Sequence, residues 1–181
     1  RRARSAMPGP SSTATLPGFK YEHAGGPSLA RVAALVTEPS SQPGLDLLSL
    51  LRLMVVNAVL GNCDAHGKNI SFLHMDDGVT LAPAYDLVST EAYAHTDLLA
   101  MRIGGVERLR HLRRADLIEQ AGALGIRERL AGRILDEIAQ QLPGALDLAL
   151  TKVASEGWES VVIERIVTGT RVRAEQVLTR L

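Results

Sequence analysis

The sequence predicts a mainly α-helical domain that carries one small β-hairpin. Apolar residues recur at helical spacing before residue 60 and again beyond residue 114. Between these regions, short apolar runs at 70–74 and 79–82 flank an Asp-Gly pair, which is typical of a hairpin turn. The chain has 181 residues, 46% of them hydrophobic, which suffices for the core of one domain.

The first predicted helix spans residues 28–37, because Ser28 precedes an apolar series at helical spacing. A polar connector leads to a second helix over 45–60, whose apolar side chains cover most of its circumference. Such a helix is expected to be central and buried. Gly61 is predicted to end it, and the small and polar residues that follow make 61–69 a loop.

The second half of the chain is predicted to be irregular from Asp86 to about residue 106. A helical tail then covers 114–181, with helices expected at 114–123, 127–141, 144–155 and 159–180, the middle two separated by Pro143-Gly144. This tail is interpreted as a scaffold. Residues 1–19 are rich in Arg, Pro, Ser and Thr and are expected to form a flexible arm ahead of a single domain at 20–181.

Composition argues against several classes of protein. Twenty basic and twenty acidic residues balance, so no global field favours nucleic acid or an anionic membrane. The single cysteine, Cys63, excludes an internal disulfide and a zinc site built on several cysteines. No run approaches the ~18 consecutive apolar residues of a membrane span, and no secretory signal pattern is present. We therefore expect a cytoplasmic protein.

Asp64, Asn69 and Asp86 are the candidate site residues. In kinases, one Asp accepts or orients the proton of the attacking hydroxyl, while an Asn five positions later and an Asp beyond a hairpin hold magnesium. Magnesium prefers oxygen ligands, and phosphoryl transfer depends on positioning and charge neutralisation. The sequence therefore predicts Asp64 as the catalytic base and Asn69 with Asp86 as the magnesium ligands.

His66 and Lys68 complete the predicted catalytic set. Asn62 stands where the protein-kinase pattern H-R-D-x-x-x-x-N has His, and His66 follows Asp64 to give D-x-H-x-x-N. This variant is similar to phosphoinositide kinases and to aminoglycoside or choline phosphotransferases. For His66 a hydrogen bond to Asp64 or Asp86 is favoured over metal coordination. Lys68 either contacts the γ-phosphate or the substrate, or is a solvated charge.

The surrounding sequence resembles the HipA family of toxin kinases. The segments that carry the resemblance are N-C-D-A-H-G-K-N-I-S at 62–71, L-A-P-A-Y-D-L at 81–87, K-Y-E-H-A-G-G-P at 20–27 and M-R-I-G-G at 101–105. Several such segments in the right order are more specific than any one of them. The resemblance implies the C-terminal lobe of a protein-kinase-like fold, with the catalytic loop at 61–69, the hairpin at 70–82 and the metal-binding segment at 85–87.

The resemblance also implies an activity and its partners. Members of the family transfer the γ-phosphate of ATP, with Mg²⁺, to serine or threonine of a protein such as an aminoacyl-tRNA synthetase. Many are neutralised by a helix-turn-helix antitoxin. The alternatives are a catalytically inactive remnant that binds an antitoxin and a phosphotransferase that acts on small molecules.

The nucleotide grip of the family is missing from its expected place. Family members carry, ahead of this part, a lobe with a phosphate-covering loop and a phosphate-binding lysine. Lys20 is the sole lysine upstream of the catalytic loop and stands in a different context. Gly25-Gly26 and Gly104-Gly105 are not expected to lie between two strands, as a phosphate loop requires. We therefore expect an isolated C-lobe whose hold on ATP is incomplete.

Other polar residues receive plainer interpretations. Cys63 is expected to be a packed thiol, because no base is assigned to it. Ser71 and Tyr85 are expected to pack or to form hydrogen bonds rather than to act as nucleophiles. The segment 108–114 holds five basic or imidazole side chains and is expected to form a locally basic, solvated surface.

Overall fold

The computed structural model describes residues 19–93, 96–158 and 160–179, so nearly all of the predicted flexible arm lies outside the described part. The prediction of a mainly helical fold is confirmed, but the described part holds two hairpins rather than one. Its helices and strands are α1 (Leu29–Thr37), α2 (Pro43–Leu60), β1 (Phe72–Met75), β2 (Gly78–Leu81), β3 (Leu98–Ile103), β4 (Val106–Arg108), α3 (Arg114–Ala123), α4 (Glu128–Ser155) and α5 (Val161–Leu178).

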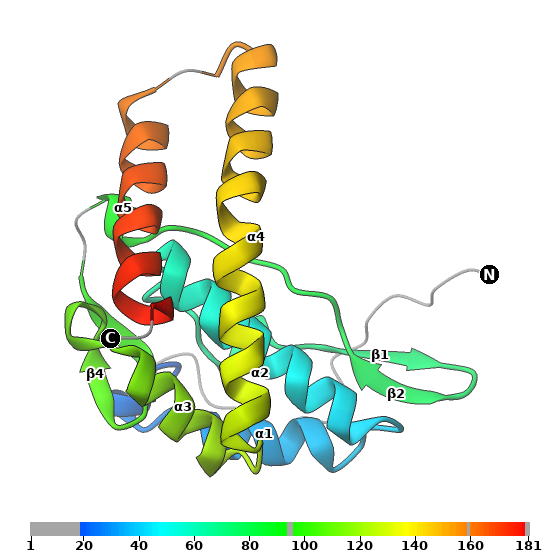
Figure 1. Cartoon of the computed structure of the whole chain (residues 1–181). Coiled ribbons are helices and arrows are strands. Elements are labelled where there is room, and N and C mark those ends of the chain that lie inside the picture. Colours follow the sequence, from blue (N-terminus) through cyan, green and yellow to red (C-terminus); the bar gives the residue numbers. More distant parts are fainter. Residues whose placement is uncertain (1–18, 94–95, 159, 180–181) are drawn as a thin grey trace.

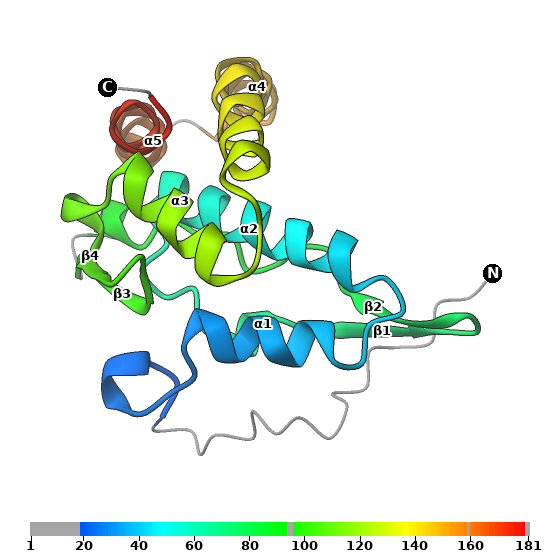
Figure 2. The same cartoon turned by 60° about the horizontal axis from the view of Figure 1, so that its bottom comes forward.

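Helix α2 forms the centre of the core, as predicted. Figure 2 shows α1 on one side of it and α4 with α5 on the other. Leu51, Val55 and Val59 of α2 are almost completely buried, and each such side chain contributes about 1.5–3 kcal/mol of burial free energy. Helix α2 is also long and apolar enough to cross a membrane, judged by length and composition alone. Core helices of soluble proteins share these properties, and α2 packs among other helices here.

The β1–β2 hairpin is attached to α2 by the buried carboxylate of Asp46. Asp46 accepts hydrogen bonds from the Thr80 hydroxyl (2.9 Å), the Leu81 backbone amide (2.9 Å) and the Ser40 hydroxyl (2.7 Å). Burial raises the pKa of Asp46, but these hydrogen bonds outweigh it and hold the pKa below its ordinary value. The hairpin is therefore fixed relative to the central helix. The segments before β1 and after β2 are fixed with it.

A second hairpin replaces the irregular chain that was predicted before residue 106. Strands β3 and β4 pair antiparallel around Gly104 and Gly105, whose φ angles are 54° and 76°. Two positive φ angles are what a tight two-residue hairpin turn requires. These glycines do lie between two strands, although not in the way that a phosphate loop requires. A Cβ on Gly104 would lie 2.5 Å from the Asp116 carbonyl oxygen, so the turn packs against α3 and is not an open phosphate loop.

Helix α4 runs through Pro143, so the predicted break between two helices was also wrong. An interior proline removes one backbone hydrogen bond and costs about 3 kcal/mol. Helices α4 and α5 pack side by side as a long antiparallel pair (Figure 1), and Leu142 still packs against the core. We infer that this packing offsets the cost of the proline.

Helix α5 contacts the end of α2 through the buried side chain of Arg173. Its Nε donates to the Val59 carbonyl (2.8 Å), and its Nη2 donates to the Leu60 carbonyl (3.0 Å). Carbonyls in the last turn of a helix lack partners within the helix, so the guanidinium caps them. Gly61 ends α2 as predicted, with φ 76°, and a Cβ there would lie 2.7 Å from Arg173 Cζ. Arg173 thus fixes the point at which the loop 61–69 begins.

Candidate active site

Asn69 and Asp86 meet beside the β1–β2 hairpin. Nδ2 of Asn69 donates a hydrogen bond to Oδ2 of Asp86, although the two residues are 17 positions apart. The hairpin brings them together, because Asn69 precedes β1 and Asp86 follows β2. The Tyr85 hydroxyl reinforces the closure by donating to the Lys68 carbonyl (2.9 Å) and by sharing a hydrogen bond with Ser71 (2.7 Å). Ser71 and Tyr85 therefore form hydrogen bonds, as the sequence led us to expect.

The backbone of Asp86 is unusual. Its φ angle is 56°, and no other residue apart from glycine has a positive φ in the described part of the chain. A left-handed conformation costs an L-residue about 1–2 kcal/mol, although Asp and Asn tolerate it better than most. Such a conformation persists only where surrounding contacts hold it. The direction of the Asp86 carboxylate thus depends on a left-handed backbone conformation that surrounding contacts must stabilise.

The residues at this point fit a magnesium ion. Asp86 has carboxylate oxygens and Asn69 has an amide oxygen, the types of ligand that the cation prefers, although in the contact between them Asn69 directs its NH₂ group at Asp86. Oδ1 of Asn69 accepts from the His66 backbone amide (3.0 Å) and keeps a second lone pair. The described residues contain no group of three or more His, Cys, Asp or Glu that could hold a metal. Phosphate oxygens and water would therefore have to supply the remaining ligands.

Asp64 forms an ion pair that was not expected from the sequence. Lys20 Nζ lies 3.0 Å from Oδ1 and 3.3 Å from Oδ2 of Asp64, and 4.5 Å from the centre of the Tyr21 ring. The side chains of Lys20 and Asp64 are 32% and 41% exposed, so the pair lies at the surface of the site and not in the core. Lys20 therefore belongs to the site.

The environment keeps Asp64 ionised. Partial burial raises its pKa, but hydrogen bonds from Tyr21 and Lys20 and the charge of Lys20 outweigh this, so the pKa of Asp64 lies below its ordinary value. Hydrogen bonds with Tyr21 and Asp64 raise the pKa of Lys20. An ionised carboxylate can accept a hydrogen bond from a hydroxyl group and orient it.

Lys20 was missed because its partner is 44 residues away in the sequence. The connection is made by the short helix Glu22–Ala24, whose Glu22 carboxylate accepts from the Arg102 amide of β3 (2.7 Å). A Cβ on Gly26 would lie 2.6 Å from the Phe19 carbonyl oxygen, so the chain doubles back there. The position of Lys20 at the head of the K-Y-E segment was the signal that could have pointed to it.

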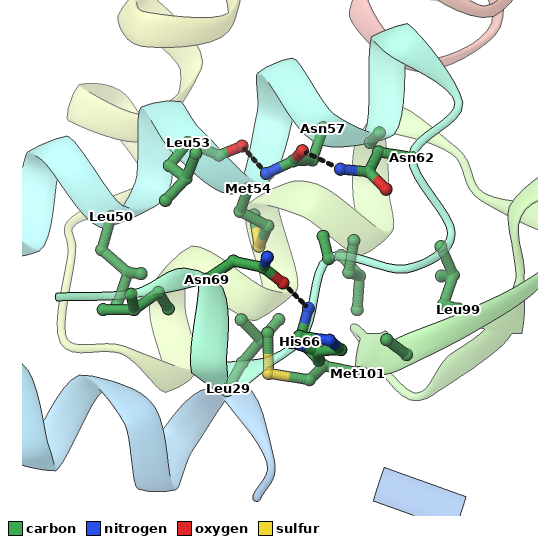
Figure 3. Close-up of a pocket in the computed structure, with 15 residues that line it drawn as sticks. Leu29, Leu50, Leu53, Met54, Asn57, Asn62, His66, Asn69, Leu99 and Met101 are labelled. Carbon is green, nitrogen blue, oxygen red and sulfur yellow. Dashed lines mark hydrogen bonds between the residues drawn. The ribbon is translucent and has the colours of Figure 1, made fainter. Parts of the chain in front are cut away.

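His66 lies beside an apolar cavity beneath the loop (Figure 3). Its Nδ1 is buried without a hydrogen-bond partner, and its ring tilts against that of Tyr21 with centroids 6.3 Å apart. Within the described residues no hydrogen bond joins the His66 ring to Asp64 or Asp86, so that expectation was wrong. His66 instead positions Asn69 through its backbone amide.

The remaining predicted residues have simpler surroundings. The Lys68 side chain is exposed. Cys63 is 2% exposed and is a packed thiol, as expected, and burial raises its pKa. In the basic segment 108–114 the side chains of Arg108 and Arg110 are exposed, as expected, although both pair with Asp97, and Arg114 pairs with Asp136.

The fold is similar to that of a solved toxin structure. HipA of Shewanella oneidensis, solved in complex with HipB and its operator DNA, superimposes with a TM-score of 0.77 at 25% identity, over 90% of this chain and 41% of that chain. The family model of the HipA-like C-terminal domain matches residues 8–146. The chain therefore belongs to the HipA-like C-terminal domain family.

Curated relatives are similar over part of the chain. A candidate kinase of Sinorhizobium fredii, Y4mE, is 46% identical over 89 residues, which cover 49% of this chain and 21% of that protein. The serine/threonine-protein kinase toxin HipA of Shewanella oneidensis is 34% identical over 98 residues, 54% of this chain and 23% of that protein. The matched part thus spans less than a quarter of either relative.

Proposed function

We propose that this chain is the catalytic lobe of a HipA-type protein kinase, which transfers the γ-phosphate of ATP to serine or threonine of a protein. The observation that carries the proposal is the direct contact of Asn69 with Asp86 at the end of the loop that holds Asp64. A base and two oxygen donors in this order are the parts that phosphoryl transfer uses. The kinase names of the relatives support the same class.

Each residue has a definite role in this proposal. Asp64, kept ionised, accepts the hydrogen bond of the substrate hydroxyl and aims its oxygen at the phosphorus atom. Lys20 balances the charge of Asp64 next to an anionic phosphate and holds the carboxylate in place. Asn69 and Asp86 hold Mg²⁺, which neutralises the phosphate oxygens when bound. Lys68, exposed beside them, contacts the phosphate or the substrate.

The amide hydrogen of Asn69 is directed at Oδ2 of Asp86. A cation held by that oxygen would compete with this hydrogen bond. The nucleotide base and ribose need further contacts, which a preceding lobe supplies in the proposed full-length kinase.

The first experiment measures metal–nucleotide binding by the chain. Binding of Mg²⁺–ATP is followed by NMR, comparing the wild type with Asp86→Asn and Asp64→Asn. The matched control is Asp76→Asn, the same substitution at an exposed carboxylate in the turn of the first hairpin. We expect Asp86→Asn to weaken binding and Asp76→Asn to leave it unchanged. Equal binding by the wild type and Asp86→Asn would refute the metal site.

The second experiment measures transfer of labelled phosphate from ATP to protein. Loss of transfer in Asp64→Asn, with transfer retained in Asp76→Asn, supports the proposed kinase. Label on a small alcohol instead of a protein would replace it with a small-molecule phosphotransferase. Transfer that is unaffected by Asp64→Asn would exclude Asp64 as the base.

A second candidate function is binding of an antitoxin. Its support is that the solved neighbour is a toxin in complex with HipB and operator DNA. We propose that this lobe binds a HipB-type helix-turn-helix antitoxin, with or without catalysis. Size-exclusion chromatography of the chain mixed with a HipB-type protein tests this, and separate elution would contradict it.

A further inference from the structure

Asn62 occupies a junction between the three parts of the site. It lies two residues after the end of α2 and is 4% exposed, and both the NH₂ group and the oxygen of its carboxamide form hydrogen bonds. Nδ2 donates to Asn57 Oδ1 (2.8 Å), seen in Figure 3, and to the Asp86 carbonyl (3.2 Å). Oδ1 accepts from the Asp64 backbone amide (3.1 Å). One buried side chain thus joins the central helix, the predicted base and the predicted metal ligand.

The orientation of the Asn62 carboxamide is determined by its neighbours. Asn57 Nδ2 donates to the Leu53 carbonyl (3.0 Å), so its Oδ1 must face Asn62. With oxygen and nitrogen exchanged, the Asn62 oxygen would face the oxygens of Asn57 and Asp86, and its NH₂ group would face the Asp64 N–H. All three contacts would then be repulsive. The side chain therefore has one arrangement, and that arrangement is fixed from α2.

The contact with Asp86 bears on the strained residue of the site. Asp86 has a φ of 56°, and Asn62 binds the carbonyl of this same residue. A hydrogen bond at the carbonyl restricts the peptide plane that follows Asp86. We propose that Asn62 is a positioning residue that holds Asp86 in its left-handed conformation and so places its carboxylate opposite Asn69.

The same side chain links Asp86 to the predicted base. Because Oδ1 of Asn62 holds the Asp64 amide, a shift of the metal segment is transmitted to the base through a single rigid amide. This role rests on the proposed function, since the ligand positions are those of the proposed kinase. The inference goes beyond that function because it gives a role to Asn62, a buried residue. That role is to align the predicted base with the predicted metal ligand.

The test uses Asn62→Ala and Asn62→Leu in the same chain, the latter keeping much of the side-chain shape. The matched control is Gln120→Ala, which removes a buried amide that is 8% exposed and binds the Gly104 amide away from the site. Two quantities are measured by NMR in folded protein. One is the φ angle of Asp86, from its three-bond HN–Hα coupling and Cα shift. The other is the Mn²⁺ concentration that broadens the Asn69 and Asp86 resonances.

We expect both Asn62 variants to lose the positive φ at Asp86 and to need about tenfold or more Mn²⁺, as is usual when the support of a metal ligand is removed. Gln120→Ala should keep the wild-type values at comparable loss of thermal stability. Retention of the positive φ in both Asn62 variants would overturn the inference. If the wild type shows no broadening by Mn²⁺, the proposed metal site fails, while the φ measurement still decides the role of Asn62.

Discussion

Replacement of Arg173 by Met tests how strongly α5 holds the end of α2. The substitution keeps an unbranched apolar stem and removes the two hydrogen bonds to the Val59 and Leu60 carbonyls. A hydrogen bond from a charged group contributes about 1.5–3 kcal/mol, so the direct loss is about 3–6 kcal/mol. Part returns because the buried guanidinium is costly to desolvate, which also lowers the pKa of Arg173. We expect a net loss of about 3 kcal/mol.

The assay is urea unfolding followed by circular dichroism, with a thermal melt as a check. For a chain of this size the melting temperature should fall by about 6–12 °C. The control is Arg171→Met on the same helix, because the Arg171–Asp147 pair is 57% and 70% exposed and should contribute less than about 1 kcal/mol. Equal stability of the two variants would refute the capping role of Arg173.

A double-mutant cycle localises the effect. A Cβ on Gly169 would lie 2.8 Å from Arg173 Nη1, whose position is held by the hydrogen bonds of the same guanidinium. Gly169→Ala should therefore destabilise the wild type by about 1–3 kcal/mol and the Arg173→Met background much less. Additive effects of the two substitutions would contradict this account.

Three other substitutions probe separate features. Lys20→Met should raise the pKa of Asp64, measured by carboxyl-carbon NMR titration, and Lys20→Arg should not; an unchanged pKa in Lys20→Met would exclude the ion pair in solution. Asp46→Asn should destabilise the fold by about 2–4 kcal/mol at pH 7 in urea unfolding. Because the pKa of folded Asp46 is depressed, its stabilisation is present above its unfolded pKa of about 3.9 and is lost as pH falls toward the folded pKa. The variant should therefore lose less stability than the wild type on acidification, and parallel curves would contradict this. Pro143→Ala should raise the free energy of unfolding, measured by calorimetry, by up to about 3 kcal/mol. No gain would show that the cost assigned to the proline is wrong.

Elements marked by local signals were predicted well. The cap Ser28 begins α1, Gly61 ends α2, and α3 covers the predicted 114–123. The second hairpin was missed because the burial of β3 does not alternate along the strand, so its sequence lacks a strand period. Pro143 was read as a break because tertiary packing, which overrides a local signal, is not visible in a short window of sequence.

In the candidate site too, residues close together in the sequence were predicted and contacts between distant segments were not. The spacing of Asp64, Asn69 and Asp86 was sufficient to single them out, because loop and hairpin lie close together in the chain. The contacts of Lys20 with Asp64 and of Arg173 with α2 join residues 44 and 113–114 positions apart. No local pattern reports such pairings, since they depend on where the first short helix and the last long helix pack.

The contact of Arg173 with Val59 also bears on when the site forms. It joins residues 114 positions apart, and contacts of such separation carry a large loop-closure entropy and form slowly. During synthesis Arg173 emerges from the ribosome more than a hundred residues after the loop 61–69. The loop should therefore stay unprotected in nascent chains that end before α5, which pulsed hydrogen exchange on stalled chains would detect. A family match that ends at residue 146 thus marks where similarity stops, and not where the chain can be cut without releasing the loop 61–69.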